Sequence, residues 1–244
     1  LGSVGAASFY VPFKKVRIWA WESYWLSQGV AAWLIAPILF AFIFVPRGEL
    51  FPIINEAPLH AKLMTMLFGA LWGFGGLTFG LSIRYLGVAL GQSIALGLCA
   101  AFGTLSPPVI AGDDLFASTA GILTVVGVSI AVAGIAVIGY AGALKSGEMS
   151  EEQKKAAVKE FALKKGILIA IFAGVMSACF NFGFESGKPI EAIALAHGTN
   201  PLFQKNTSLI FILFGGFLTN LFYCGYLNIK NKTYKAYYTV SGSV

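Results

Sequence analysis

Four polar side chains occur at helical spacing within an apolar stretch. Ser177, Asn181 and Glu185 are four residues apart, and Lys188 follows three residues later. Residues with this spacing lie on one face of a helix. Because polar groups at membrane depth must face protein or water, the stripe predicts one wall of a polar cavity that contacts a substrate. In the alternative interpretation, Glu185 and Lys188 lie at the headgroup level and pair only with each other.

A carboxylate, Glu22, lies within a run of aromatic residues. Trp19, Trp21, Tyr24 and Trp25 flank it in the sequence. Aromatic neighbours that exclude water strengthen the binding of a proton to a carboxylate, so Glu22 is a candidate for a group that loads and unloads a proton. The alternative is a solvated acid within an interfacial aromatic belt.

Other polar residues give weaker signals. Gln92 lies within an apolar stretch and is a further candidate for substrate contact. His60 and His197 are expected to be solvated loop residues. The cysteines have no paired or metal-ligand spacing, and no phosphate-binding loop occurs. The sequence therefore predicts no catalytic residue, no metal and no cofactor, and it argues against an enzyme.

The chain that carries these residues is too apolar for a water-soluble protein. Of its 244 residues, 57% are hydrophobic and 11% are charged, with a net charge of +6. Soluble domains carry about 25% charged residues. Lys and Arg fall between the apolar stretches and form no basic arm, so the positive charge indicates membrane orientation and no nucleic-acid partner. The lipid bilayer is the expected environment.

Apolar stretches of the length needed to cross a bilayer, about 20 residues, recur along the chain. Six complete candidates are Tyr24–Val45, Leu63–Ile83, Leu86–Ser106, Thr119–Tyr140, Gly166–Ser186 and Ser208–Asn228. Residues 1–12 are too short to cross and predict the second half of a partial first span. We therefore expect an all-α, polytopic membrane helix bundle and number its spans 1 to 7.

The distribution of positive charge predicts how the bundle is oriented. Most Lys and Arg residues outside the spans follow spans 1, 3, 5 and 7. Positive residues in short loops resist translocation, so these loops are expected in the cytoplasm. The longest of them, residues 141–165, is expected to link two halves of the protein.

Gly and Pro predict packing and bending inside the spans. Gly69 with Gly73, and Gly76 with Gly80, are small residues four apart that predict helix contact faces in span 3. The short connection after span 3 predicts that spans 3 and 4 form a tight antiparallel pair. Pro37 predicts a bend in span 2 that frees a backbone carbonyl.

A weak internal sequence similarity relates spans 1 and 6, which are expected to cross the membrane in opposite directions. Gly5, Ser8, Phe9 and Phe13 in span 1 are similar to Gly174, Ser177, Phe180 and Phe184 in span 6. Inverted repeats of five helices would produce this relation. We therefore expect residues 1–144 to form a first repeat with a truncated first span, residues 145–165 a cytoplasmic linker, and residues 166–244 the start of a second repeat.

Several sequence blocks resemble the bacterial L-rhamnose/proton symporter family of the drug/metabolite transporter superfamily. They are FYVPFKKVRIWAWES (9–23), LFGALWGFGGLTFGLSIRYLGVALGQSIALGL (67–98), GTLSPPVIAG (103–112) and KKGILIAIFAGVMSACFNFGFESGKP (164–189). The resemblance implies an inner-membrane carrier of ten helices in two inverted repeats, of which this chain would be a fragment, and proton-coupled uptake of a sugar. An exporter or exchanger of another small metabolite is the alternative, and a membrane-embedded enzyme is less favoured. The sequence does not indicate an oligomeric state.

Overall fold

The computed structural model describes residues 19–112, 114–148 and 162–238, and these residues form helices and no strand. The elements are α2 (Trp21–Gly29), η2 (Val30–Ile35, a π-helix), α3 (Ala36–Phe44), α4 (Leu50–Glu56), α5 (Leu59–Leu86), α6 (Val88–Ala111), α7 (Thr119–Glu148), α9 (Leu163–Ala196), α10 (Lys205–Lys230) and η3 (Thr233–Tyr237, a 3₁₀-helix). The all-α prediction is confirmed for the described part of the chain.

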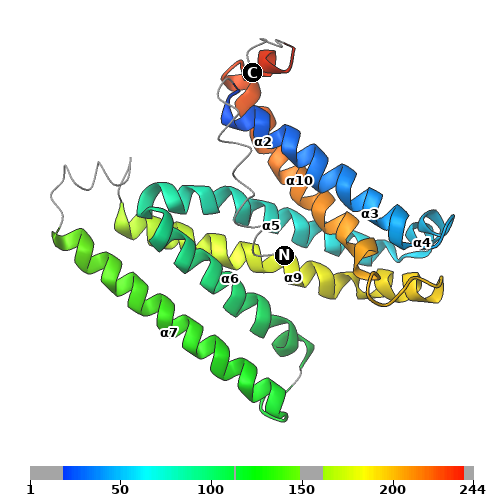
Figure 1. Cartoon of the computed structure of the whole chain (residues 1–244), viewed down its shortest axis with the longest axis horizontal. Coiled ribbons are helices and arrows are strands. Elements are labelled where there is room, and N and C mark those ends of the chain that lie inside the picture. Colours follow the sequence, from blue (N-terminus) through cyan, green and yellow to red (C-terminus); the bar gives the residue numbers. More distant parts are fainter. Residues whose placement is uncertain (1–18, 113, 149–161, 239–244) are drawn as a thin grey trace.

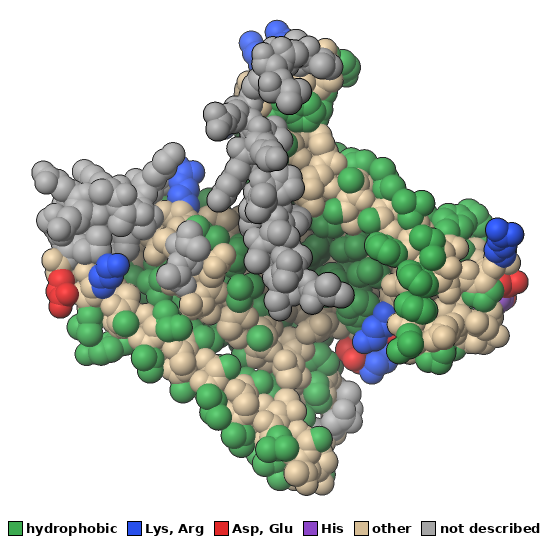
Figure 2. All heavy atoms as spheres, viewed as in Figure 1, with side chains coloured by type: hydrophobic (Ala, Val, Ile, Leu, Met, Phe, Trp, Pro, Cys, Tyr) green, Lys and Arg blue, Asp and Glu red, His purple; other side chains and the backbone are tan. Residues whose placement is uncertain are grey.

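Six helical segments are long and apolar enough to cross a membrane. They are Trp21–Phe44, Leu59–Leu86, Leu90–Ile110, Thr119–Gly142, Leu163–Ala196 and Lys205–Lys230. They coincide with the six complete spans predicted from the sequence, whereas the expected partial first span lies outside the described residues. Figure 2 shows hydrophobic side chains over much of one face, with Lys and Arg gathered toward its margins.

Helices α5 and α9 form the centre of the bundle (Figure 1). The N–H of Ala162, just before α9, donates to the carbonyl of Tyr85 at the end of α5. The start of α9 therefore lies beside the end of α5, and the two helices are antiparallel. Helix α10 packs on one side of this pair and carries α2 and α3 on its other face, whereas α6 packs on the opposite side and carries α7. The short helix α4, which is not part of a membrane-spanning segment, also contacts α9.

Glycines bring the backbones of α5 and α10 into direct contact. A Cβ atom on Gly69 would lie 2.0 Å from the carbonyl oxygen of Ile212, and one on Gly215 would lie 2.0 Å from that of Met66. Such approach favours association in lipid, where no hydrophobic force drives helices together. Gly73 also faces α10, at Gly216.

The structure confirms the predicted contact face at Gly69 and Gly73 but not the one at Gly76 and Gly80. Among the described residues, no atom lies within 4 Å of a Cβ added to Gly76 or Gly80. Spans 3 and 4, which are α5 and α6, do pack together, with Gly91 against Ser82. However, α5 packs more extensively on α9 and α10 than on α6, because the glycine face of α5 is directed toward those two helices.

Helix α9 continues well past Ser186, where span 6 was predicted to end. Pro189 lies inside the helix, and Ile190 and Ala194 beyond it are fully buried. They belong to an apolar cluster with Ala41 of α3 and Ile53 of α4. This burial stabilises the extra turns, which the polar residues at 185–189 had concealed in the sequence.

The contact between α5 and α10 generates a stability prediction. Gly215→Val should lower the melting temperature of the protein in detergent, because overpacking a close contact costs about 1–3 kcal/mol or more. Gly76→Val makes the same change on α5 where no neighbour is met, so it should melt close to the unchanged protein. Equal melting temperatures for the two variants would contradict the assignment.

Candidate functional site

Span 2 is interrupted by the π-helix η2, immediately before Pro37. The N–H of Ala36 donates to the carbonyl of Ala31, five residues back, instead of to that of Ala32. Pro37 has no N–H, so it supplies no donor to the carbonyls of Ala32 or Trp33. The structure therefore places a π-turn beside Pro37, and the Ala32 carbonyl lacks a helical donor at both the fourth and the fifth following residue. Such π-turns are frequent at functional sites.

Aromatic rings beside this π-turn form a row that joins three helices. Trp33 of η2 lies edge-to-face with Trp72 of α5, with ring centroids 6.0 Å apart, and Trp72 lies 5.1 Å from Phe180 of α9. Phe184 continues the row at 5.2 Å from Phe180. We call Trp33, Trp72, Phe180 and Phe184 the aromatic row, and each of them is partly exposed.

Hydrogen-bonding groups flank the aromatic row. Trp25 lies 5.8 Å from Trp33, and its indole N–H donates to Oδ1 of Asn220 at 2.9 Å. Thr219 donates to the carbonyl of Ala70. Aromatic surfaces with a few fixed polar groups are typical of sites for small polar molecules, because rings cover C–H groups while the polar groups orient the ligand.

The predicted stripe on span 6 contacts different helices along its length. Ser177 lies against Gly75 of α5, where an added Cβ would be 2.6 Å from the Ser177 hydroxyl. Asn181 donates from Nδ2 to the carbonyl of Gly103 in α6 at 3.0 Å. Glu185 forms an ion pair with Lys188, and both side chains are largely exposed. The stripe thus lies along α9, with Phe180 and Phe184 of the aromatic row interspersed.

Gln92, the remaining substrate-contact candidate, is separated from the stripe. It lies in α6, 11 residues before Gly103. At 1.5 Å per residue, this is about 16 Å along the helix from the Asn181 contact. The structure therefore does not bring Gln92 and Asn181 together.

Glu22 is buried, with 7% of its surface exposed, at the start of α2. Its Oε1 accepts hydrogen bonds from Nδ2 of Asn231 and from the hydroxyl of Thr233, both at 2.9 Å. The polar residues that follow α10 therefore contact this carboxylate, which the sequence did not predict. Trp25 packs inward on Asn220, while Trp21 stacks on Trp25 and is 40% exposed.

His197 departs from the expectation of a solvated loop residue. Its Nδ1 lies 2.6 Å from Oε2 of Glu49, and its Nε2 lies 3.0 Å from Oε2 of Glu56. The hydrogen bond to Glu56, and to a smaller extent the one to Glu49, raises the pKa of His197 above its usual value of 6.5. His60, in contrast, is exposed as expected, but it lies in the first turn of α5 and not in a loop.

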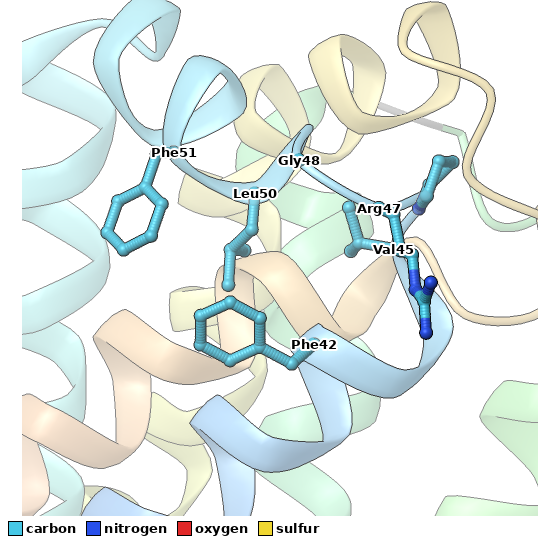
Figure 3. Close-up of a pocket in the computed structure, with 7 residues that line it drawn as sticks. Phe42, Val45, Arg47, Gly48, Leu50 and Phe51 are labelled. Carbon is cyan, nitrogen blue, oxygen red and sulfur yellow. The ribbon is translucent and has the colours of Figure 1, made fainter.

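The turn between α3 and α4 positions Glu49 for this contact. Leu50 and Phe42 point toward each other across a small cavity of about 80 Å³ (Figure 3). Leu50 is buried, so Glu49 is held at the start of α4 beside the end of α9. We call His197, Glu49 and Glu56 the histidine clip.

Sequence reasoning missed one buried acid, Glu191. It is 6% exposed and accepts a hydrogen bond from the Ser208 hydroxyl at 2.6 Å. Gly183, Gly187 and Glu191 are four residues apart and so lie on one helix face. The two glycines indicate a close helix contact on the face that carries Glu191. This indication was missed because the span was ended before Lys188 and Pro189.

A larger groove of about 610 Å³ lies between α6, α7 and α9, and its lining is almost wholly apolar. Ser106 is the polar side chain among its lining residues. A sugar needs several hydrogen-bond partners, so the aromatic row is the better candidate for a site that binds one.

The membrane-spanning helices, the interrupted span and the buried acids together define a polytopic membrane protein with the features of a secondary transporter. The whole chain, residues 1–244, matches the family described as L-rhamnose-proton symport protein (RhaT). The chain belongs to this family, which is one of transporters and not of enzymes.

Curated relatives support the same assignment. The L-rhamnose-proton symporters of Yersinia pestis bv. Antiqua (strain Antiqua) and Yersinia pseudotuberculosis serotype O:3 (strain YPIII) are each 36% identical to this chain. Each match covers 99% of this chain and 69% of the relative. No solved structure matches the chain significantly.

The histidine clip generates a pH prediction. Because the folded-state pKa of His197 is raised, the stabilisation from the clip is fully present below about pH 6.5 and is lost as the pH rises through the raised pKa. Melting temperatures of the protein in detergent should therefore fall over this range. His197→Gln should remove that part of the fall, whereas His60→Gln should preserve it. The same pH dependence in His197→Gln would show that the clip does not contribute.

Proposed function

We propose that the chain belongs to a secondary active transporter that couples uptake of a sugar such as L-rhamnose to proton entry. The observation that carries this proposal is the match over the whole chain to a symporter family, together with relatives named L-rhamnose-proton symporter. The six membrane-spanning helices and the aromatic row are consistent with it.

The proposed location is the bacterial inner membrane, within a ten-helix carrier of two inverted repeats. The positive-inside rule supports a cytoplasmic position for the loops after spans 1, 3, 5 and 7. In this orientation, Glu22 lies near the cytoplasmic face and the histidine clip lies near the outer face. Residues 149–161 of the proposed cytoplasmic linker lie outside the described residues.

The aromatic row is the proposed platform for the sugar. Trp72 packs against Gly216, near the middle of α10, so the row lies about midway along the membrane helices. Transporters commonly bind substrates at this depth beside interrupted helices. A 6-deoxy sugar presents a methyl group and C–H faces for the rings, and its hydroxyl groups suit the Ala32 carbonyl and the polar stripe of Ser177, Asn181 and Glu185.

Glu22 is the proposed acid through which the proton leaves toward the cytoplasm. Its position at the cytoplasmic end of α2 suits release. The carboxylate form is held by two hydrogen bonds from Asn231 and Thr233. Movement of the residues after α10 would change how that form is stabilised, and so couple proton release to conformation.

Uptake of labelled L-rhamnose into membrane vesicles tests the function and the role of Glu22 together. With a gradient of about one pH unit, acid outside, each coupled proton supports about tenfold accumulation. Glu22→Gln should retain sugar exchange, which needs no net proton movement, and lose accumulation. Glu148→Gln, an exposed acid at the end of α7, is the control. Gradient-driven efflux instead of uptake would favour the exporter, and full accumulation by Glu22→Gln would exclude its coupling role.

Substitution of the central ring of the row tests sugar binding. Trp72→Leu should raise the sugar concentration for half-maximal uptake about two- to twelvefold, because stacking on an aromatic ring contributes about 0.5–1.5 kcal/mol. Phe74→Leu changes an exposed aromatic residue on the same helix and should leave this value unaltered. An unchanged concentration dependence in Trp72→Leu would place the sugar elsewhere.

A further inference from the structure

Glu191 is a buried carboxyl group that the proposed proton path through Glu22 does not use. It lies in α9, within a membrane-spanning segment, and only 6% of its surface is exposed. A buried acid on a membrane-spanning helix is expensive to keep and is by default a functional candidate. The contacts of Glu191 indicate whether it only links helices or can also bind a proton.

The hydrogen bond between Ser208 and Glu191 suits both protonation states of the acid. The Ser208 hydroxyl lies 2.6 Å from Oε1 of Glu191 and 3.1 Å from the carbonyl of Lys205. When Glu191 is a carboxylate, Ser208 donates to it. When Glu191 binds a proton, its own O–H donates to Ser208, and the serine proton turns to the Lys205 carbonyl. Neither state leaves either partner unpaired.

A second buried hydroxyl lies beside this pair. An added Cβ on Gly187, one turn before Glu191, would be 3.3 Å from the Ser208 hydroxyl and 3.6 Å from that of Thr65. The Thr65 side chain is fully buried, and its oxygen has no hydrogen-bond partner in the described part of the chain. A second polar side chain therefore lies beside the Glu191–Ser208 pair within the buried contact of α5, α9 and α10.

Arg47 in the turn before α4 and His60 at the start of α5 are charged or titratable groups on the surrounding elements. The other charged groups there have partners of their own. These groups are Glu185 and Lys188 on α9, Lys205 on α10, Lys62 on α5, Glu56 on α4, and Glu49 and His197 in the adjoining turns. Lys188 pairs with Glu185, Lys62 donates to the carbonyl of Ile54, Lys205 lies over the Phe184 ring, and His197 joins the two glutamates of the clip. Within residues 19–112, 114–148 and 162–238, the structure gives Glu191 no cationic partner. A proton is then the ligand that can neutralise the carboxylate.

We propose that Glu191 binds the coupling proton at the outer end of the transporter, a role that rests on the proposed proton symport. Ser208 and Asn228, which contact the Glu191 and Glu22 regions, are 20 residues apart on α10. This separation is about 30 Å, close to the thickness of the hydrocarbon core. A proton from external water converts the Glu191 carboxylate to a carboxylic acid, and its later loss toward the cytoplasmic side restores the carboxylate.

Infrared difference spectroscopy of the purified protein tests proton binding without any sugar. The stretching band of a protonated carboxyl group should grow as the pH falls, and Glu191→Gln should remove that component. Ser208→Ala should move its midpoint to higher pH, because the hydrogen bond that is lost is stronger to the charged carboxylate than to the neutral acid. Glu148→Gln should retain both the component and its midpoint.

Transport by the same variants links this proton to uptake. Glu191→Gln should exchange labelled L-rhamnose yet lose about tenfold accumulation in a gradient of one pH unit. An unchanged infrared component in Glu191→Gln, an unmoved midpoint in Ser208→Ala, or full accumulation by Glu191→Gln would overturn the proposal. If the unchanged protein shows the infrared component but moves no L-rhamnose, the proposed function fails while the proton site at Glu191 stands.

Discussion

The close contact of α5 with α9 and α10 is the constraint on which the rest of the structure depends. In lipid, helices are held together by van der Waals packing, and this requires backbones to approach closely. Gly69 and Gly215 make such approach possible between α5 and α10, and Gly75 does so against α9. Once α10 is fixed in this position, its two ends determine which residues can surround the buried acids.

The two ends of α10 provide different surroundings for an acid. Near its start, Ser208 faces Glu191 with a hydroxyl that pairs with either protonation state. After its end, Asn231 and Thr233 donate to Glu22 and so hold the carboxylate form. The aromatic row touches α10 between them, at Gly216. A proton and a sugar that share this framework would therefore affect the same helix, which is a physical basis for coupling.

The interruption of span 2 shows how an irregular backbone is tolerated inside the bundle. Pro37 removes one donor and the π-turn displaces another, yet the surrounding helices keep the segment in place. Trp33 lies at this turn and meets Trp72 across the interface. The irregularity and the aromatic row therefore occur together, as is common where membrane helices line a substrate path.

The sequence by itself determined the helical class and the six complete spans, because a long apolar stretch is a local property that the bilayer selects directly. It also indicated an irregular helix at Pro37 and, as one of two alternatives, a Glu22 carboxylate shielded from water. Both indications come from a few neighbouring residues. The sequence did not reveal the histidine clip or the burial of Glu191, and it ended span 6 at Ser186. Those features depend on residues distant in the sequence, such as Glu49 meeting His197 and α4 burying Ile190. Only the tertiary structure decided them, because the environment of a side chain is set by which helices pack against it.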